Sequence, residues 1–193
     1  MPELSKDETV KAEILQAAEN VFQKWGFNKT TMEDIAPEAG KGKSTIYYYY
    51  KSKEEIFEVL AAKELNAIFE RTKAAIDKID SSKEKLKKYV TISINELKKT
   101  ASIHPVVKGE MKGHKELIDK IRRQLDMREE STVLKILKRG FELGEFRSLR
   151  KSELGKAASV VVGIVRGLEL YLFLEIDDDE KLDIATRLMA EGL

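Results

Sequence analysis

Hydroxyl groups, aromatic rings and ammonium groups are concentrated between Gly40 and Lys53 of this 193-residue chain. The segment reads GKGKSTIYYYYKSK and carries four lysines and no acidic residue, whereas the whole chain has a net charge of only +1. Such groups donate hydrogen bonds to phosphate oxygens and to the edges of bases. Because a small footprint on nucleic acid needs local rather than global positive charge, the segment predicts contact with DNA.

Two short helical patterns position this segment. The first opens with Thr30 and Glu33 at the spacing of a capping box and stops at Gly40, a residue suited to a left-handed helix end. After a turn of three or four residues, a second helix fits from Lys43 to Tyr50. The pair is typical of a helix-turn-helix motif, whose second helix enters the major groove of DNA.

The second helix has two different faces. Ile46 and Tyr50 share one stripe, while Ser44, Tyr48 and Lys51 lie on the opposite side. On composition alone, four adjacent tyrosines fit an aromatic packing layer equally well. Four consecutive helical positions span nearly the whole circumference, however, so they cannot all be buried in a short helix. At least Tyr48 is expected to face solvent or a partner.

The first 55 or so residues resemble the tetracycline-repressor (TetR/AcrR) family of bacterial transcriptional regulators. The matching residues are Phe22, Trp25, Gly26, Phe27, Thr30 to Ala36, Ala39, Gly40, and Thr45 to Phe57. The resemblance implies an all-α fold, with a helix-turn-helix DNA-binding domain over residues 1–53 and a helical effector-binding and dimerisation domain over residues 54–193. It also implies that the protein is a regulator, not an enzyme.

The resemblance assigns DNA contacts residue by residue. Base or phosphate contacts are expected at Lys43, Ser44, Thr45, Tyr47, Tyr48 and Tyr49, and phosphate contacts at Thr31 and Lys53. The helical faces add Lys51. In the turn, Lys41 and Gly42 depart from the family pattern, which predicts either a looser turn or a second helix capped by Gly42 itself. Pro37 lacks an N–H group inside the first helix of the motif, which predicts a kinked or late-starting helix.

The rest of the chain also favours helices, because it has only three prolines, 36% charged residues and no alternating apolar pattern. A first helix is expected over Thr9 to Lys24, with Trp25 continuing its buried face. Ser52 and Glu55 form another capping box that starts a helix ending near Ile79. Further helices are expected over residues 82–101, briefly from 105, over 114–143, where Gly144 ends the helix, over 152–175, and from 178 to the C-terminus.

Residues 155–174 are apolar around most of a helical circumference and rich in small side chains. Such a helix is either central in its own domain or shared with a partner. The resemblance favours the second interpretation, because the last two long helices of the family form a dimer interface. It implies a homodimer whose paired recognition helices meet a near-palindromic operator.

The resemblance further implies a pocket for an unidentified small-molecule effector. Candidate lining residues, each equally compatible with ordinary core, are Tyr89, Ile92, Ile103, His104, Met111, Phe141 and Tyr171. His104 and His114 lie too far apart, with too few other ligands, to predict a metal site. Arg122 and Arg123 could meet an anionic effector, although solvated surface is the simpler interpretation.

Other classes of function find little support. The absence of cysteine excludes disulfides and fits a reducing cytoplasm, and Arg166 and Glu169 interrupt the most apolar segment, so no membrane crossing is expected. GKGKST lacks the spacing of a phosphate-binding loop, and no nucleophile or cofactor motif indicates an enzyme. The prediction is a ligand-responsive repressor without a cofactor, and the alternative is a constitutive DNA-binding regulator.

Overall fold

The computed structural model describes residues 5–103, 115–174, 180–181, 184–185 and 187–188. Every regular element in these ranges is helical, which confirms the all-α prediction. The described chain divides into two compact units. The first contains residues 5–64 and 115–121, and the second contains residues 65–103 and the described residues from 122 onward. The division therefore falls within helices that continue from one unit into the other.

Helix α1 (Lys6–Trp25) begins at a capping box that the sequence analysis missed. The amide of Glu8 donates to the hydroxyl of Ser5 at 3.2 Å, and the amide of Ser5 donates to the Glu8 carboxylate at 2.8 Å. These bonds satisfy amides that have no partner within the helix. The helix consequently starts three residues before the predicted Thr9.

Helix α2 (Met32–Glu38) begins with Thr31 as its cap, so the predicted box of Thr30 and Glu33 is wrong. The amide of Asp34 donates to the Thr31 hydroxyl at 3.3 Å, and the Asp34 carboxylate accepts from the Thr31 amide at 2.8 Å. Thr30 cannot cap the helix because it is buried and its hydroxyl donates to the carbonyl of Gly26 at 2.6 Å.

The turn between α2 and α3 (Lys43–Tyr49) covers residues 39–42, within the predicted length. Gly40 has a φ of 61°, the left-handed conformation expected of it. Of the two alternatives for this turn, the structure has Gly42 as the cap of α3, and its carbonyl accepts from the amide of Thr45 at 2.9 Å. Pro37 lies in the last turn of α2, where few helical hydrogen bonds follow it.

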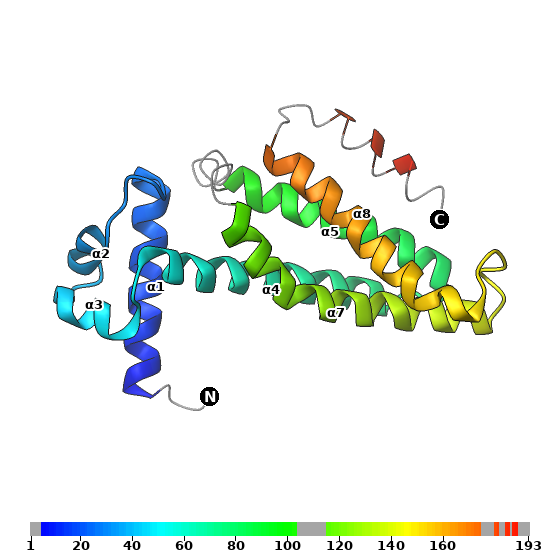
Figure 1. Ribbon diagram of the computed structural model, residues 1–193, viewed down its shortest axis with the longest axis horizontal. Coiled ribbons are helices and arrows are strands. Elements are labelled where there is room, and N and C mark those ends of the chain that lie inside the picture. The colour runs from blue at the N-terminus through cyan, green and yellow to red at the C-terminus, as the bar shows by residue number, and fades with distance from the viewer. Residues whose placement is uncertain (1–4, 104–114, 175–179, 182–183, 186, 189–193) are drawn as a thin grey trace. The chain divides into compact units, whose positions relative to one another are not determined.

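The core of the first unit lies where α1 contacts α2 and α2 contacts α3, with both short helices on the same side of α1 (Figure 1). Phe22, Phe27 and Phe57 place their ring centroids 5.0 to 6.0 Å from one another. Trp25 was expected in this core, but 45% of its surface is exposed, whereas Phe27 is fully buried. The turn at Gly26 separates the two residues, and only the chain beyond it re-enters the core.

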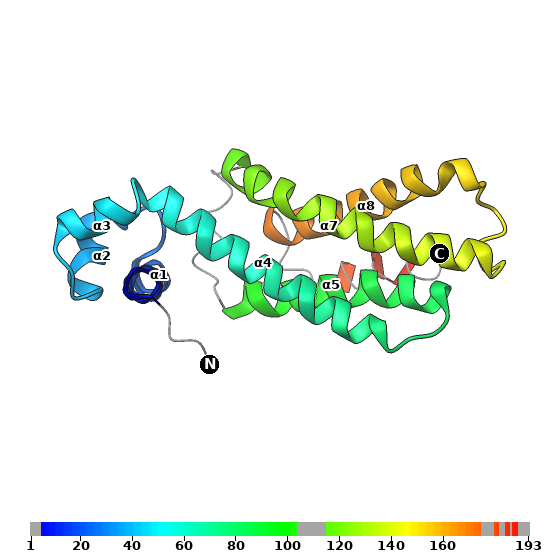
Figure 2. The same ribbon diagram turned by 90° about the horizontal axis from the view of Figure 1, so that it is seen from below.

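The second unit is a bundle in which α5 (Ser82–Ile103), α8 (Leu154–Leu174) and the part of α7 (Lys115–Glu142) from residue 122 onward run beside the later part of α4 (Lys53–Asp77) (Figure 2). A short 3-10 turn, η2 (Lys151–Glu153), precedes α8. These bounds agree with the predicted ones to within a few residues. The short helix predicted from residue 105 lies outside the described residues, as does most of the last one.

Side-chain contacts join the helices of the second unit. Arg71 of α4 donates to Glu96 of α5 at 2.6 Å, and Arg166 of α8 donates to Asp126 of α7 at 2.8 Å. The apolar core between them includes Ile76, Leu86, Tyr89, Val90, Ile94, Val133, Leu137, Val162 and Val165. No helix in the described part of the chain is long and apolar enough to cross a bilayer.

Two helix ends in the second unit are joined by one carboxylate. Gly144 ends α7 in the left-handed conformation, with a φ of 73°, as predicted. The next residue, Glu145, accepts from the amide of Lys83 and the hydroxyl of Ser81, each at 2.8 Å, and from the amide of Ser82 at 3.2 Å. These bonds lower the pKa of Glu145, the amide of Lys83 contributing most. Glu145 thereby caps the first turn of α5.

Candidate nucleic-acid interface

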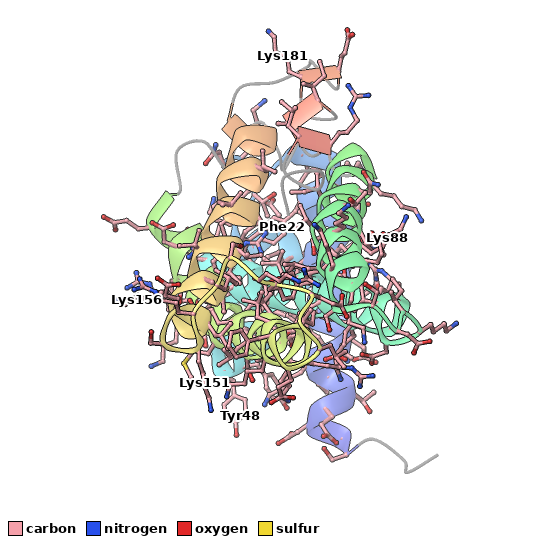
Figure 3. The ribbon with its side chains drawn as sticks, turned by 90° about the vertical axis from the view of Figure 1, so that its right-hand side faces the viewer. Phe22, Tyr48, Lys88, Lys151, Lys156 and Lys181 are labelled. Atoms are coloured by element: carbon pink, nitrogen blue, oxygen red, sulfur yellow. The ribbon has the colours of Figure 1, made fainter. Side chains whose placement is uncertain are left out.

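Helix α3 presents its predicted polar face to solvent. Tyr48 is 78% exposed and extends away from the ribbon (Figure 3), and Tyr47 is 42% exposed. Ser44 is exposed as well, whereas Ile46 and Tyr50 are buried. The division of this helix into a core face and an outer face is therefore confirmed, although the contact with DNA stays a prediction.

The ring of Tyr48 is braced by its neighbour. Tyr48 and Tyr49 pack edge to face, with ring centroids 4.9 Å apart. The hydroxyl of Tyr49 donates to the carboxylate of Asp7 in α1 at 2.8 Å, and this hydrogen bond raises the pKa of Tyr49. Tyr49 therefore ties α3 to the start of α1, and its hydroxyl is directed at protein rather than outward.

Two of the predicted cationic groups are paired with carboxylates on the neighbouring helices. Lys43 forms an ion pair with Glu33 of α2, and Lys41 forms one with Glu13 of α1 at 2.7 Å. The hydrogen bond from Lys43 lowers the pKa of Glu33 and raises that of Lys43. Both side chains of the Lys43 pair are largely exposed, so the pair is weak.

Lys51 and Lys53 differ sharply although both were predicted to contact DNA. Lys51 is exposed, and its ammonium group has no hydrogen bond or ion pair in the described part of the chain. The ammonium group of Lys53 instead donates to the carbonyls of Phe27, Asn28 and Thr30, at 2.7, 3.0 and 2.9 Å. Since a lysine has three donors, these three bonds occupy all the donors of Lys53, and its phosphate contact stays a prediction.

The remaining predicted contacts lie beside this face. Thr31 is exposed, but its hydroxyl donates to the carboxylate of Asp34 at 2.6 Å, so it serves the cap of α2. Thr45 is half-buried near the start of α3. Sequence reasoning missed the acidic partners Glu13, Glu33 and Asp7, because no periodic pattern links residues on different helices. Local hydrophobic spacing could have found only the faces of each helix.

The predicted effector-pocket residues are only partly described. Tyr89 is buried in the core of the second unit, and Ile92 and Phe141 pack against that core. The side chains of Ile103, His104, Met111 and Tyr171 lie outside the described residues, as does His114. Arg122 is buried, which corrects the simpler expectation of a solvated side chain, whereas Arg123 is exposed. Among the described residues, no group of acidic or histidine side chains is placed to hold a metal ion.

A three-helix unit with an exposed polar and aromatic face on its third helix defines the class of helix-turn-helix proteins. Comparison with known proteins gives the family. Residues 14–60 match the sequence model described as "Bacterial regulatory proteins, tetR family". Over residues 14–60 the chain thus matches the TetR family of bacterial transcriptional regulators.

Relatives and solved structures agree with this match. The uncharacterised HTH-type transcriptional regulator YfiR of Bacillus subtilis is 43% identical over 58 residues, which are 29% of this chain and 28% of that protein. The HTH-type transcriptional repressor KstR2 of Mycolicibacterium smegmatis is 36% identical over 74 residues, 38% of this chain and 36% of that protein. The matches thus span about a quarter to two fifths of the length of such relatives.

Two solved structures have the same fold over nearly the whole chain. A TetR/AcrR family regulator from Thermobifida fusca has a TM-score of 0.69 at 20% identity and covers 94% of this chain and 97% of its own. The fatty acid degradation regulator FadR from Bacillus halodurans has a TM-score of 0.63 at 20% identity and covers 100% of this chain and 98% of its own. The likeness of fold therefore extends to the second unit.

Proposed function

We propose that this chain is a cytoplasmic transcriptional repressor that binds near-palindromic duplex DNA as a homodimer and responds to a small molecule. The observation that carries the proposal is the outer face of α3. There Ser44, Tyr47 and Tyr48 expose hydroxyls and rings, and Lys51 adds an ammonium group next to them. Repression, rather than activation, is supported by the name of the relative KstR2.

Helix α3 is the recognition helix in this proposal. Its first turn, from Lys43 to Thr45, faces the edges of bases in the major groove, and the hydroxyl of Tyr48 reaches a phosphate or its ring a thymine methyl group. Lys51 contacts phosphate without reading sequence. Lys43 also contacts phosphate when a phosphate replaces the Glu33 carboxylate as its partner. The burial of Ile46 and Tyr50 fixes the helix so that these groups point outward.

An exposed stripe on α8 supports the homodimer. Val160 is 58% exposed and Ile164 is 40% exposed, although both are apolar. A methyl group added at Gly163 or Gly167 would meet nothing within 4 Å, so the stripe is also open to close approach. A second copy of the same stripe covers it by two-fold symmetry, which sets two recognition helices about 34–36 Å apart on DNA. Light scattering at micromolar concentration should give a dimer, and a stable monomer would contradict the proposal.

Response to an effector is the proposed means of control. A small molecule bound in the second unit favours a dimer geometry whose recognition helices no longer fit successive grooves. By reciprocity, operator DNA must weaken effector binding by the same factor. A thermal-shift screen of small molecules against the purified chain should identify compounds that raise its melting temperature. Equal affinity of such a compound with and without operator would exclude this mechanism.

A constitutive DNA-binding regulator is the second candidate. It is favoured by Tyr89, Ile92 and Phe141, because all three predicted pocket residues with described side chains pack in or against the core. In that case no small molecule in the thermal-shift screen changes the melting temperature of the chain, and none changes its affinity for the operator.

Selection of genomic fragments by the purified chain tests the DNA-binding proposal directly. Recovery of fragments that share an inverted repeat, with half-sites centred about one helical turn apart, is the expected result. Fragments should be selected in parallel with a Tyr48→Ala variant, whose fold is expected to be intact. A fragment pool without any shared sequence, or identical pools from both proteins, would count against the assigned face of α3.

A further inference from the structure

Lys53 occupies an unusual place for a residue expected to bind phosphate. It is the first residue of α4, yet its ammonium group points back at the connection between α1 and α2. There it donates to the carbonyls of Phe27, Asn28 and Thr30, and it lies 4.7 Å from the centroid of the Phe27 ring. Three carbonyl oxygens and an aromatic face together stabilise the ammonium group in this position relative to solvent.

The connection that Lys53 holds leads directly into the helix-turn-helix motif. Thr30 is followed by Thr31, the cap of α2, and the Thr30 hydroxyl is itself bound to the carbonyl of Gly26 at 2.6 Å. Helix α2 packs against α3, and a four-residue turn connects the two helices. A bond from the start of α4 to this connection therefore constrains where α2 begins, and with it the direction of α3.

We propose that Lys53 is a positioning residue for DNA recognition and not a phosphate ligand. It fixes the connection between α1 and α2 against the start of α4, so that α3 has a single orientation. The predicted effect on DNA recognition rests on the proposed function, whereas the predicted effect on the fold does not. When the bond is lost, contacts that need exact placement against base edges weaken, but the positive charge available to phosphates is unchanged.

The two roles predict different salt dependence. Each phosphate contact releases counterions, so its loss lowers the slope of log affinity against log salt by about one and weakens binding to all sequences alike. A positioning residue leaves that slope unchanged and reduces discrimination between sequences. Lys51, two residues away and exposed, provides a matched control for the phosphate role.

The test uses the full-length chain with Lys53→Met and Lys51→Met variants. Each is titrated with a selected operator fragment and with a scrambled duplex of equal length over a series of salt concentrations. Lys53→Met should weaken operator binding by about 5- to 150-fold, the cost of one base contact, without changing the salt slope or the affinity for scrambled DNA. Lys51→Met should weaken both duplexes alike and lower the slope by about one. If Lys53→Met also weakened both duplexes alike and lowered the slope, the inference would be overturned. Unchanged operator affinity of Lys53→Met would overturn it as well.

A Lys53→Arg variant keeps the charge but not the geometry. A planar guanidinium readily binds phosphate, yet its fork cannot direct donors to three carbonyls around one point. The positioning role predicts that arginine fails to restore operator affinity, and full restoration would overturn it. This variant carries the binding test if Lys53→Met does not fold.

Hydrogen exchange without DNA separates this inference from the proposed function. Amide exchange in residues 32–38 should accelerate at least about tenfold in Lys53→Arg, relative to residues 14–22 of α1 in the same sample. Unchanged relative exchange would overturn the inference whether or not the protein binds DNA. Accelerated exchange in a chain that selects no DNA would retain the structural role and reject only the proposed function.

Discussion

Lys43, at the start of α3, forms an ion pair with Glu33, in the first turn of α2. The pair crosses the turn of the helix-turn-helix motif and occupies an ammonium group of the proposed DNA-binding face. In the proposed function, Glu33 competes with phosphate for the same ammonium group. We therefore expect Glu33 to affect DNA affinity although it lies outside α3.

Replacing Glu33 with glutamine should strengthen binding to operator and to unrelated DNA alike, by about two- to fivefold, because an exposed ion pair is a weak competitor. Gel-shift titration at low salt measures the effect. In a Lys43→Met background the same replacement should have no effect, since the pair is already gone. An equal gain in both backgrounds would show that Glu33 acts through general repulsion of DNA.

Tyr48 and Tyr50 form a matched pair on opposite faces of α3. Tyr48→Ala should cost ~1–3 kcal/mol of operator binding and leave the stability of the fold unchanged, because the ring is exposed. Tyr50→Ala should instead reduce the free energy of unfolding by ~3–5 kcal/mol, because the ring is buried. Urea denaturation and gel shifts on both variants test the pair. Loss of stability in Tyr48→Ala would mean that its face is not exposed in solution.

Trp25 and Phe27 should differ in the same way. Phe27→Ala removes a ring from the cluster with Phe22 and Phe57 and should cost ~3–5 kcal/mol in the free energy of unfolding. Trp25→Ala should cost less than about 1 kcal/mol, because the indole is partly exposed. Tryptophan fluorescence of the wild type should show an emission maximum typical of a partly solvated indole, and a strongly blue-shifted maximum would contradict the exposed position.

Glu145 should make stability depend on pH in the acid range. Its pKa lies below the ordinary value of 4.5 because the amide of Lys83 and its neighbours donate to the carboxylate. A lowered pKa in the folded state adds stability above the ordinary pKa, and this contribution is lost as pH falls through the lowered value. Glu145→Gln should therefore melt about 2–4 °C lower than wild type at pH 7. The difference should persist down to about pH 5 and vanish in stronger acid, and a constant difference at every pH would contradict this linkage.

The stripe on α8 should tolerate no charge if it is the dimer interface. Val160→Glu places like charges near each other across a two-fold axis and should raise the dimer dissociation constant by about 30-fold or more. Met127→Glu is the control, since Met127 is exposed on α7 and is not part of the proposed stripe on α8. Sedimentation velocity distinguishes the two variants. Dimers of equal strength in both would place the interface elsewhere.

Local sequence determined much of the candidate site. Helical spacing was enough to bury Ile46 and Tyr50 and to expose Tyr48, because the faces of a short helix depend only on its period. Gly40 and Gly144 marked a turn and a helix end, because a left-handed conformation suits glycine wherever it occurs. The bounds of the long helices followed from the same local signals.

Tertiary structure decided which of the marked groups remain available for DNA. Lys51 and Lys53 look alike in the sequence, but the carbonyls that bind Lys53 come from residues 23 to 26 positions earlier. Tyr49 donates to Asp7, 42 positions earlier in the chain. Phe27 is buried in the core, whereas Trp25 is partly exposed. Such pairings depend on how helices pack, and side-chain type and spacing cannot specify them because many distant partners offer the same hydrogen bonds.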